Sequence, residues 1–172
     1  MVIPDSGNKS LDVLISIRRA NEITYRAISE AVRKHGCTRE QFEVLWACEL
    51  SARPITPAEL SRWTFRQPHS VVGLLNRMEK QGLIERRRND SGPKRTLVSP
   101  TPKGREILDV AYPAMVHVVN GIYHHFPEDE MLQFSHFLKR VHDAALEELK
   151  SSVHKHRPAR RKRNAASSSQ TT

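Results

Sequence analysis

The sequence has little of what most enzymes and secreted proteins depend on. Its 172 residues include only two cysteines, Cys37 and Cys48, and seven glycines. No C-x-x-C pair, signal peptide or membrane-length apolar run is present, which predicts a protein of the reducing cytoplasm. The motifs GxxxxGK[ST], GxGxxG and GxSxG are also missing, so we predict neither an enzyme nor a cofactor-binding protein.

Acidic residues are also too few to balance the basic ones. Lys and Arg number 28 against 19 Asp and Glu, giving a net charge of +9. Six of these basic residues lie between positions 154 and 163, and without them the charge falls by six to +3. The excess favours a polyanionic partner. We predict that residues 151–172, basic and then rich in Ser and Thr, form a disordered tail.

What the chain does have is helical periodicity, interrupted by clear start and stop signals. After a flexible lead at residues 1–10, apolar residues recur at helical spacing over residues 11–34, and Gly36 ends that helix. Thr38 with Gln41, and Thr56 with Glu59, predict capping boxes at the starts of the next two helices. Two further helices are expected from residue 101 to about 125 and from about 127 to 149.

Between these helices lies a pattern typical of a winged helix-turn-helix. A helix over residues 68–81 has the inward stripe Val71, Leu74, Leu75 and Met78. Extended runs at 83–87 and 95–99 then flank a basic turn, which predicts a β-hairpin. The predicted fold is therefore mainly α with a small β-hairpin wing. We expect residues 37–100 to form the DNA-binding domain, and residues 11–36 and 101–150 to form a helical dimerisation region, since their apolar surface exceeds what one chain can cover.

Three segments resemble the MarR (multiple-antibiotic-resistance regulator) family of transcription factors. They are TPAELS at 56–61, VVGLLNRMEKQGLIER at 71–86 and LVSPTPKG at 97–104. The resemblance implies a homodimer that binds a palindromic operator, represses transcription and is released by a small, often aromatic, effector. The family's wing usually carries an Asp-Arg pair, but Gly92 and Pro93 stand there, so Lys94 or Arg95 would have to replace the arginine.

Candidate DNA contacts lie on the helix at 68–81 and on the wing. Near the helix start, side chains and backbone amides meet DNA, where Gln67 suits adenine and Val72 suits a thymine methyl group. Arginines before and within this helix are expected to hold phosphates, and the basic hairpin needs a polyanion to offset its repulsion. The full set of predicted DNA-binding residues is Arg66, Gln67, His69, Ser70, Val72, Arg77, Arg86, Arg88, Lys94 and Arg95.

Several residues allow other interpretations. Trp46 and Trp63 suit core packing better than ligand stacking. Cys37, predicted to be exposed after three basic residues, suits an inert role better than redox sensing, and Cys48 is expected in mid-helix. The five histidines His117, His124, His125, His136 and His142 lack metal-binding spacing, so no metal site is predicted. A winged-helix module for protein–protein contact and a redox- or metal-sensing regulator remain the alternative functions.

Overall fold

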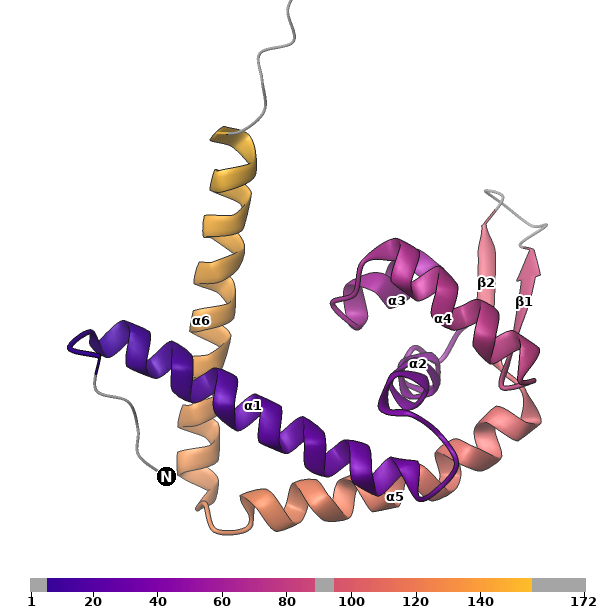
Figure 1. The fold of residues 1–172 in the computed structure, drawn as a ribbon, viewed down its shortest axis with the longest axis horizontal. Coiled ribbons are helices and arrows are strands. Elements are labelled where there is room, and N and C mark those ends of the chain that lie inside the picture. The colour runs from indigo at the N-terminus through magenta and orange to yellow at the C-terminus, as the bar shows by residue number, and fades with distance from the viewer. Residues whose placement is uncertain (1–5, 89–94, 156–172) are drawn as a thin grey trace, which may run out of the picture. The chain divides into compact units, whose positions relative to one another are not determined.

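The computed structural model has six helices and one hairpin in the part of the chain it describes, residues 6–88 and 95–155 (Figure 1). In chain order the elements are α1 (Lys9–Arg33), α2 (Arg39–Leu50), α3 (Pro57–Trp63), α4 (Pro68–Lys80), β1 (Ile84–Arg88), β2 (Thr96–Pro100), α5 (Pro102–Tyr123) and α6 (Glu128–Lys155). This confirms the predicted fold class. Residues Met1–His124 form one compact unit, and His125–Thr172 form a second.

Helix starts follow the predicted capping chemistry. Thr38 and Thr56 each accept a hydrogen bond from the backbone amide three residues on, and the side chains of Gln41 and Glu59 each accept one from the backbone amide of the cap residue. The first helix begins at Lys9, two residues earlier than predicted, because the Asn8 side chain accepts hydrogen bonds from the backbone amides of Ser10 and Leu11. A side-chain cap satisfies donors that have no partner in the first helical turn.

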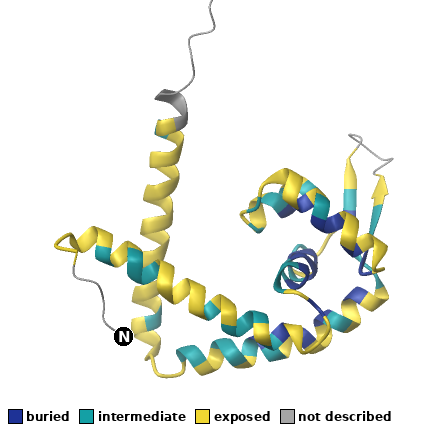
Figure 2. Ribbon diagram, in the orientation of Figure 1, coloured by how far each residue is buried: buried dark blue, intermediate teal, exposed yellow. Residues whose placement is uncertain are grey.

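The core of the first unit lies between α2, α3, α4, the hairpin and α5. The predicted inward stripe of α4 is buried as expected, together with Leu45 of α2 and Leu60 of α3. Helix α1 packs along α5, and α2 contacts both. The core therefore holds α4 by one face and leaves its other face exposed (Figure 2).

The hairpin is displaced by one residue from the predicted strands. Ile84 pairs with Pro100, and Arg88 pairs with Thr96, in an antiparallel register. Ile55, in the segment before α3, forms a single antiparallel bridge with Val98 of β2, so this segment lies beside the wing. The predicted turn with Gly92, Pro93 and Lys94 lies outside the described residues, as do residues 1–5 of the lead and 156–172 of the tail.

Hydrogen bonds join the start of the wing to the start of α5. The backbone amide of Thr101 donates to the Leu83 carbonyl at 3.1 Å, and the Thr101 hydroxyl donates to the Gly82 carbonyl at 2.6 Å. Gly104 is buried against the Leu83 carbonyl. A Cβ at this position would lie 2.1 Å from the Leu83 oxygen. A glycine at this position lets α5 approach the wing closely.

Exposed large apolar side chains are most numerous on α1 and α6. In α1, Leu14 and Ile23 are each 61% exposed, and α6 is exposed along nearly its whole described length (Figure 2). The exposed large apolar residues of α6 are Leu132, Phe134, Phe137, Leu138, Val141, Leu146 and Leu149. Across the described residues, no helix combines the length and apolar character that crossing a membrane requires.

Candidate nucleic-acid interface

A short turn joins α3 to α4 and fixes where α4 begins. The Ser61 hydroxyl donates to the Arg66 carbonyl at 2.6 Å, and the Arg66 amide donates back to the Ser61 carbonyl at 3.1 Å. Phe65, between them, has φ = +53°. A bulky residue in this left-handed region is strained, so the surrounding contacts must hold the turn.

The predicted base-reading residues share the exposed side of α4. Gln67, His69 and Ser70 are exposed at its first turn, and Val72 is 45% exposed. Gln67 is the N-cap residue but makes no side-chain capping bond. These residues form a mostly polar surface at the end of the helix where backbone amides and the helix dipole favour an anion.

Arg77 lies further along the same helix. It is exposed, and a Cβ added at Gly73 would lie 3.7 Å from its Nη1 atom. The guanidinium therefore occupies the space beside Gly73, one turn closer to the start of α4 than its own Cα. This position suits contact with a phosphate beside the groove.

The wing arginines have two different environments. Arg86 donates from Nε to Glu79 at 3.0 Å, from Nη2 to Asn76 at 2.8 Å, and also pairs through Nη2 with Glu79. The Arg86 hydrogen bond is the main reason that the pKa of Glu79 is lowered. Arg86 therefore fastens β1 to α4, and a phosphate would have to compete with Glu79 for it.

Arg87, Arg88 and Arg95 are exposed on the outer part of the wing. Arg87 pairs with Glu85 at 3.1 Å, in a contact that water screens. With Arg86, Glu79 and Thr96, these three arginines line a cavity of about 500 Å³. Lys94, the remaining predicted contact, lies outside the described residues.

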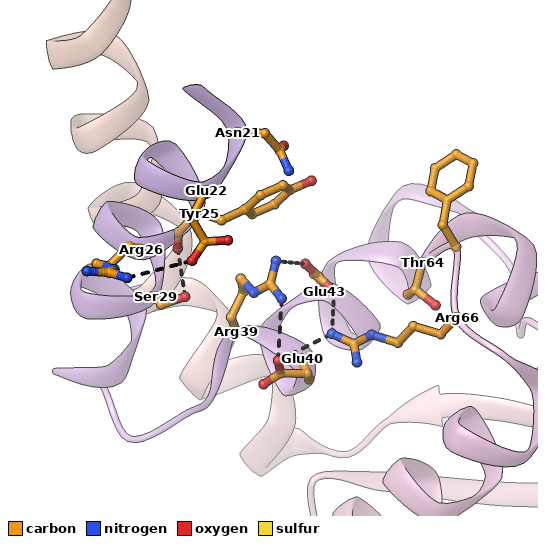
Figure 3. A pocket seen from close by; sticks show the side chains of 11 residues that line it. Asn21, Glu22, Tyr25, Arg26, Ser29, Arg39, Glu40, Glu43, Thr64 and Arg66 are labelled. Atoms are coloured by element: carbon orange, nitrogen blue, oxygen red, sulfur yellow. Dashed lines mark hydrogen bonds and ion pairs between the residues drawn. The ribbon is translucent and has the colours of Figure 1, made fainter. Parts of the chain in front are cut away.

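Arg66 is directed toward α2 instead of a free surface. Its Nη2 atom lies 3.3 Å from Glu40 and 3.7 Å from Glu43, and Arg39 lies 3.5 and 3.4 Å from the same two carboxylates (Figure 3). We name these four residues the Arg39–Arg66 network. Its i,i+4 pair, Arg39 and Glu43, is visible in the sequence, but the partnership with Arg66 depends on how the turn folds back.

The pKa values of the two network carboxylates are shifted in opposite directions. Burial is the largest cause of the raised pKa of Glu43, although both arginines act to lower it. Burial also acts to raise the pKa of Glu40, but its hydrogen bonds to its own backbone and to Thr38, with the two arginines, outweigh it and lower that pKa. Glu43 is thus the less favourably ionised partner of the arginines.

The network forms one wall of an open pocket that was not predicted from the sequence. The pocket has a volume of about 600 Å³ between α1, α2 and the turn before α4 (Figure 3). Tyr25 of α1 lies under the Arg39 guanidinium, with 4.5 Å from the carbon to the ring centroid. Its lining residues are Asn21, Glu22, Tyr25, Arg26, Ser29, Arg39, Glu40, Glu43, Thr64, Phe65 and Arg66.

A smaller aromatic cavity of about 170 Å³ shares residues with this pocket, Tyr25 and Phe65 among them. Trp46 is half-buried and stacks on Phe42 at 5.9 Å, as the core-packing prediction requires. Trp63 meets Trp46 edge-on at 5.5 Å but is 36% exposed, so it lies at the rim of the core.

The prediction that Cys37 is exposed is wrong. Cys37 is 3% exposed at the end of the first helix, with its Sγ 3.7 Å from the Val32 carbonyl oxygen. Burial raises its pKa to about 11, and burial together with Glu49 raises the pKa of Cys48 to about 12. Neither thiol has the thiolate character of a redox sensor at neutral pH.

Among the described residues, no three His, Cys, Asp or Glu side chains are grouped so that they could hold a metal ion.

Comparison with known proteins finds one family model and several solved structures that are similar to this chain. The model of the MarR family matches residues 35–95, and no protein of curated function matches the sequence. A cysteine variant of MarR from E. coli, solved with operator DNA, matches with a TM-score of 0.71 and 24% identity, over 80% of this chain and 99% of that one. CouR from Rhodococcus jostii RHA1, bound to p-coumaroyl-CoA, matches with a TM-score of 0.71 and 20% identity, over 79% and 95%.

A third match is the organohalide-sensing regulator RdhR-CbdbA1625 in its ligand-free form. Its TM-score is 0.72 and its identity 20%, over 83% of this chain and 86% of that one. The family model covers α2, α3, α4 and the start of the wing, and the solved structures extend the shared fold to the outer helices. The chain thus has the winged-helix fold of these solved regulators, and its residues 35–95 match the model of the MarR family.

Proposed function

We propose that this chain is a homodimeric repressor that binds a near-palindromic operator and is released from it by a small-molecule effector. One observation carries the proposal: Gln67, His69 and Ser70 are exposed at the start of α4, in the same compact unit as a wing rich in exposed arginines. A helix start that presents polar side chains beside a basic hairpin suits the major groove with its flanking phosphates. The operator complex of the similar E. coli protein supports this.

The outer helices supply the dimer. The apolar residues of α1 and α6 are exposed in one chain, and an apolar surface of this extent is typical of an interface. We therefore assign residues 11–36 and 101–150 to dimerisation and 37–100 to DNA binding. Light scattering at micromolar concentration should give twice the chain mass of 19.7 kDa. A mass of one chain would contradict the assignment.

The effector would bind in the pocket between α1, α2 and the turn before α4. The p-coumaroyl-CoA in CouR and the organohalide response in the name of RdhR-CbdbA1625 support a small-molecule effector for a protein of this fold. A redox effector is not favoured, because burial raises the pKa of both thiols.

The operator can be obtained by selection from a pool of random duplexes. Two copies of α4 in a symmetric dimer should select half-sites with centres about one helical turn, roughly 34 Å, apart. Affinity for the selected duplex and for a scrambled one is then measured at one fixed salt concentration.

The readout is tested with two alanine variants. Gln67→Ala and His69→Ala should each cost about 1–3 kcal/mol on the selected duplex and much less on the scrambled one. Leu50→Ala, at an exposed leucine of α2 outside both the predicted DNA contacts and the residues assigned to dimerisation, is the control and should leave both affinities unchanged. Equal losses on both duplexes would mean that these side chains position the DNA backbone and do not read bases.

A further inference from the structure

The base of the hairpin is buried, whereas its outer half is exposed. Ile84 of β1 and Val98 of β2 belong to the core, but Arg88 and Thr96, which pair at the far end of the described strands, are exposed (Figure 2). A two-stranded hairpin is marginally stable in water unless it packs against another element. The orientation of the outer half of the wing therefore depends on the side chains that join it to α4.

Arg86 lies between these two halves and joins β1 to α4. It is opposite Val98 in the hairpin, and its side chain is directed at α4. Its Nε and Nη2 atoms both donate to Oε2 of Glu79, and Nη2 also donates to Asn76 at 2.8 Å. The Arg86 side chain is only 24% exposed, so these charge-assisted bonds are partly shielded from water. We name this contact the Glu79–Arg86 pair.

Glu79 is an acidic residue in a cavity whose other charged lining residues are arginines. It shares the cavity of about 500 Å³ with Arg86, Arg87, Arg88 and Arg95. A carboxylate at this position repels a phosphate backbone, so its charge by itself weakens DNA binding. Glu79 favours DNA binding only if the geometry that it imposes contributes more than its charge costs.

We propose that Glu79 and Arg86 are positioning residues for DNA binding, which fix the angle between the wing and α4. Arg86 then acts through Glu79 and does not touch a phosphate, although the sequence predicted it as a DNA contact. An acidic side chain thus strengthens the binding of a polyanion. This inference rests on the proposed DNA-binding function, except that the effect of the pair on the wing can be tested without DNA.

The angle matters because three arginines lie beyond Arg86 on the wing. Arg87, Arg88 and Arg95 are exposed there, and the direction of the strands at Arg86 decides which phosphates their guanidinium groups can reach while α4 lies in the groove. A wing that is already in place also loses less conformational entropy when DNA binds. The pair therefore contributes to affinity through preorganisation.

The effect on the wing is measured by hydrogen–deuterium exchange on the full chain without DNA. Glu79→Gln and Arg86→Lys should make the backbone amides of residues 86–88 and 95–97 exchange at least about threefold faster, because a weaker pair lets the outer hairpin open more often. Glu85→Gln is the matched control. It removes the same charge from β1, where Glu85 pairs with the exposed Arg87 at 3.1 Å, and should change these rates by less than about 1.5-fold.

DNA binding is measured by fluorescence anisotropy with the selected duplex at one fixed salt concentration. Loss of a negative charge beside DNA should by itself favour binding, so Glu85→Gln should bind as tightly as the unchanged chain or up to about threefold more tightly. Glu79→Gln removes the same charge but should bind at least about threefold more weakly, because the wing is no longer held. Opposite signs from the same change of charge separate positioning from electrostatics.

Two further variants change the partner. Arg86→Lys keeps the positive charge but loses the planar geometry that serves Glu79 and Asn76 together, so it should also weaken DNA binding at least about threefold. In Arg86→Gln, Glu79 has lost this partner and only repels DNA. Adding Glu79→Gln to that variant should therefore tighten binding, so the effect of one substitution changes sign with the presence of the other.

Each result supports or overturns a defined step. Circular dichroism melting shows whether each variant is folded, and Glu79→Asp, which keeps the charge but shortens the side chain, should weaken binding as Glu79→Gln does. If Glu79→Gln binds DNA as tightly as the unchanged chain, or Arg86→Lys keeps full affinity, Arg86 is a phosphate contact and the proposal is wrong. Unchanged exchange in Glu79→Gln would show that the pair does not hold the wing. If no duplex is ever selected, the proposed DNA-binding function fails, whereas faster exchange would still show that the pair fixes the wing.

Discussion

Replacing Gly104 by alanine should disrupt the close packing between the wing and α5 and so destabilise the protein. Alanine is favoured over glycine by about 1 kcal/mol in a helix interior, so helix propensity alone predicts a more stable protein. The added Cβ, however, would lie 2.1 Å from the Leu83 carbonyl oxygen and 3.0 Å from Cδ2 of Leu45. A backbone carbonyl cannot turn aside as the end of a flexible side chain can, so either α5 or the start of β1 must move.

The size of the effect follows from two costs and one gain. Overpacking a core typically costs about 1–3 kcal/mol, and occasionally more. Moving the Leu83 carbonyl also strains the hydrogen bond that it accepts from Thr101 at 3.1 Å, which contributes about 1 kcal/mol. After subtracting the helix-propensity gain, we expect Gly104→Ala to lower the free energy of unfolding by about 1–3 kcal/mol. The melting temperature of a chain this size should then fall by about 2–12 °C.

The assay is thermal and urea unfolding followed by far-ultraviolet circular dichroism, at one fixed protein concentration because the stability of the proposed dimer would depend on concentration. Gly121→Ala is the matched control, since Gly121 lies in the same helix and an added Cβ meets nothing within 4 Å. It should change stability little or raise it by up to about 1 kcal/mol. If Gly104→Ala melts at or above the temperature of the unchanged chain, the close contact with Leu83 does not exist as described.

Three further predictions test the wing, the thiols and a helix start. Lys94→Ala and Arg95→Ala should each make the slope of log affinity against log salt shallower by about one, for any duplex; an unchanged slope would remove that residue from the DNA contacts. Cys37 and Cys48 should react with a disulfide reagent at neutral pH far more slowly in the native chain than in urea, since burial raises their pKa values to about 11 and 12; equal rates would show that they are accessible. Glu59 has its pKa lowered from 4.5 to about 2, first by the Arg53 hydrogen bond and then by Thr56. Its stabilising effect should be complete above pH 4.5 and lost as the pH falls toward 2, so Glu59→Gln should flatten the dependence of the urea midpoint on pH in that window, and an unchanged dependence would contradict this.

Local chemistry explains why most of the fold could be predicted from the sequence. The capping boxes at Thr38 and Thr56 need only residues three apart, so their hydrogen bonds follow from the sequence alone. The stripe of α4 repeats at helical spacing, and burying it leaves Gln67 and His69 on the opposite side. The exposed side of α4 was therefore predictable from the sequence, although the bases that we propose it reads were not.

Contacts between distant parts of the chain had no local signal. Arg66 is similar to the other arginines around α4 in the sequence, yet it pairs with Glu40, which is 26 residues away. Arg86 is similar to Arg87 and Arg88, but only Arg86 reaches Glu79 and Asn76. Cys37 follows three basic residues and so suggested an exposed position, whereas the turn after α1 buries it.

The sequence by itself determined the order of the helices, their capped starts, the inward side of α4 and the presence of a basic hairpin, because each depends on spacings of a few residues. Only the tertiary structure decided which arginines are occupied by carboxylates, that α1, α2 and the turn before α4 enclose a pocket, and that Gly104 must be a glycine. Those features depend on side chains and carbonyls that meet across the fold, where distance, burial and competing charges outweigh any local preference.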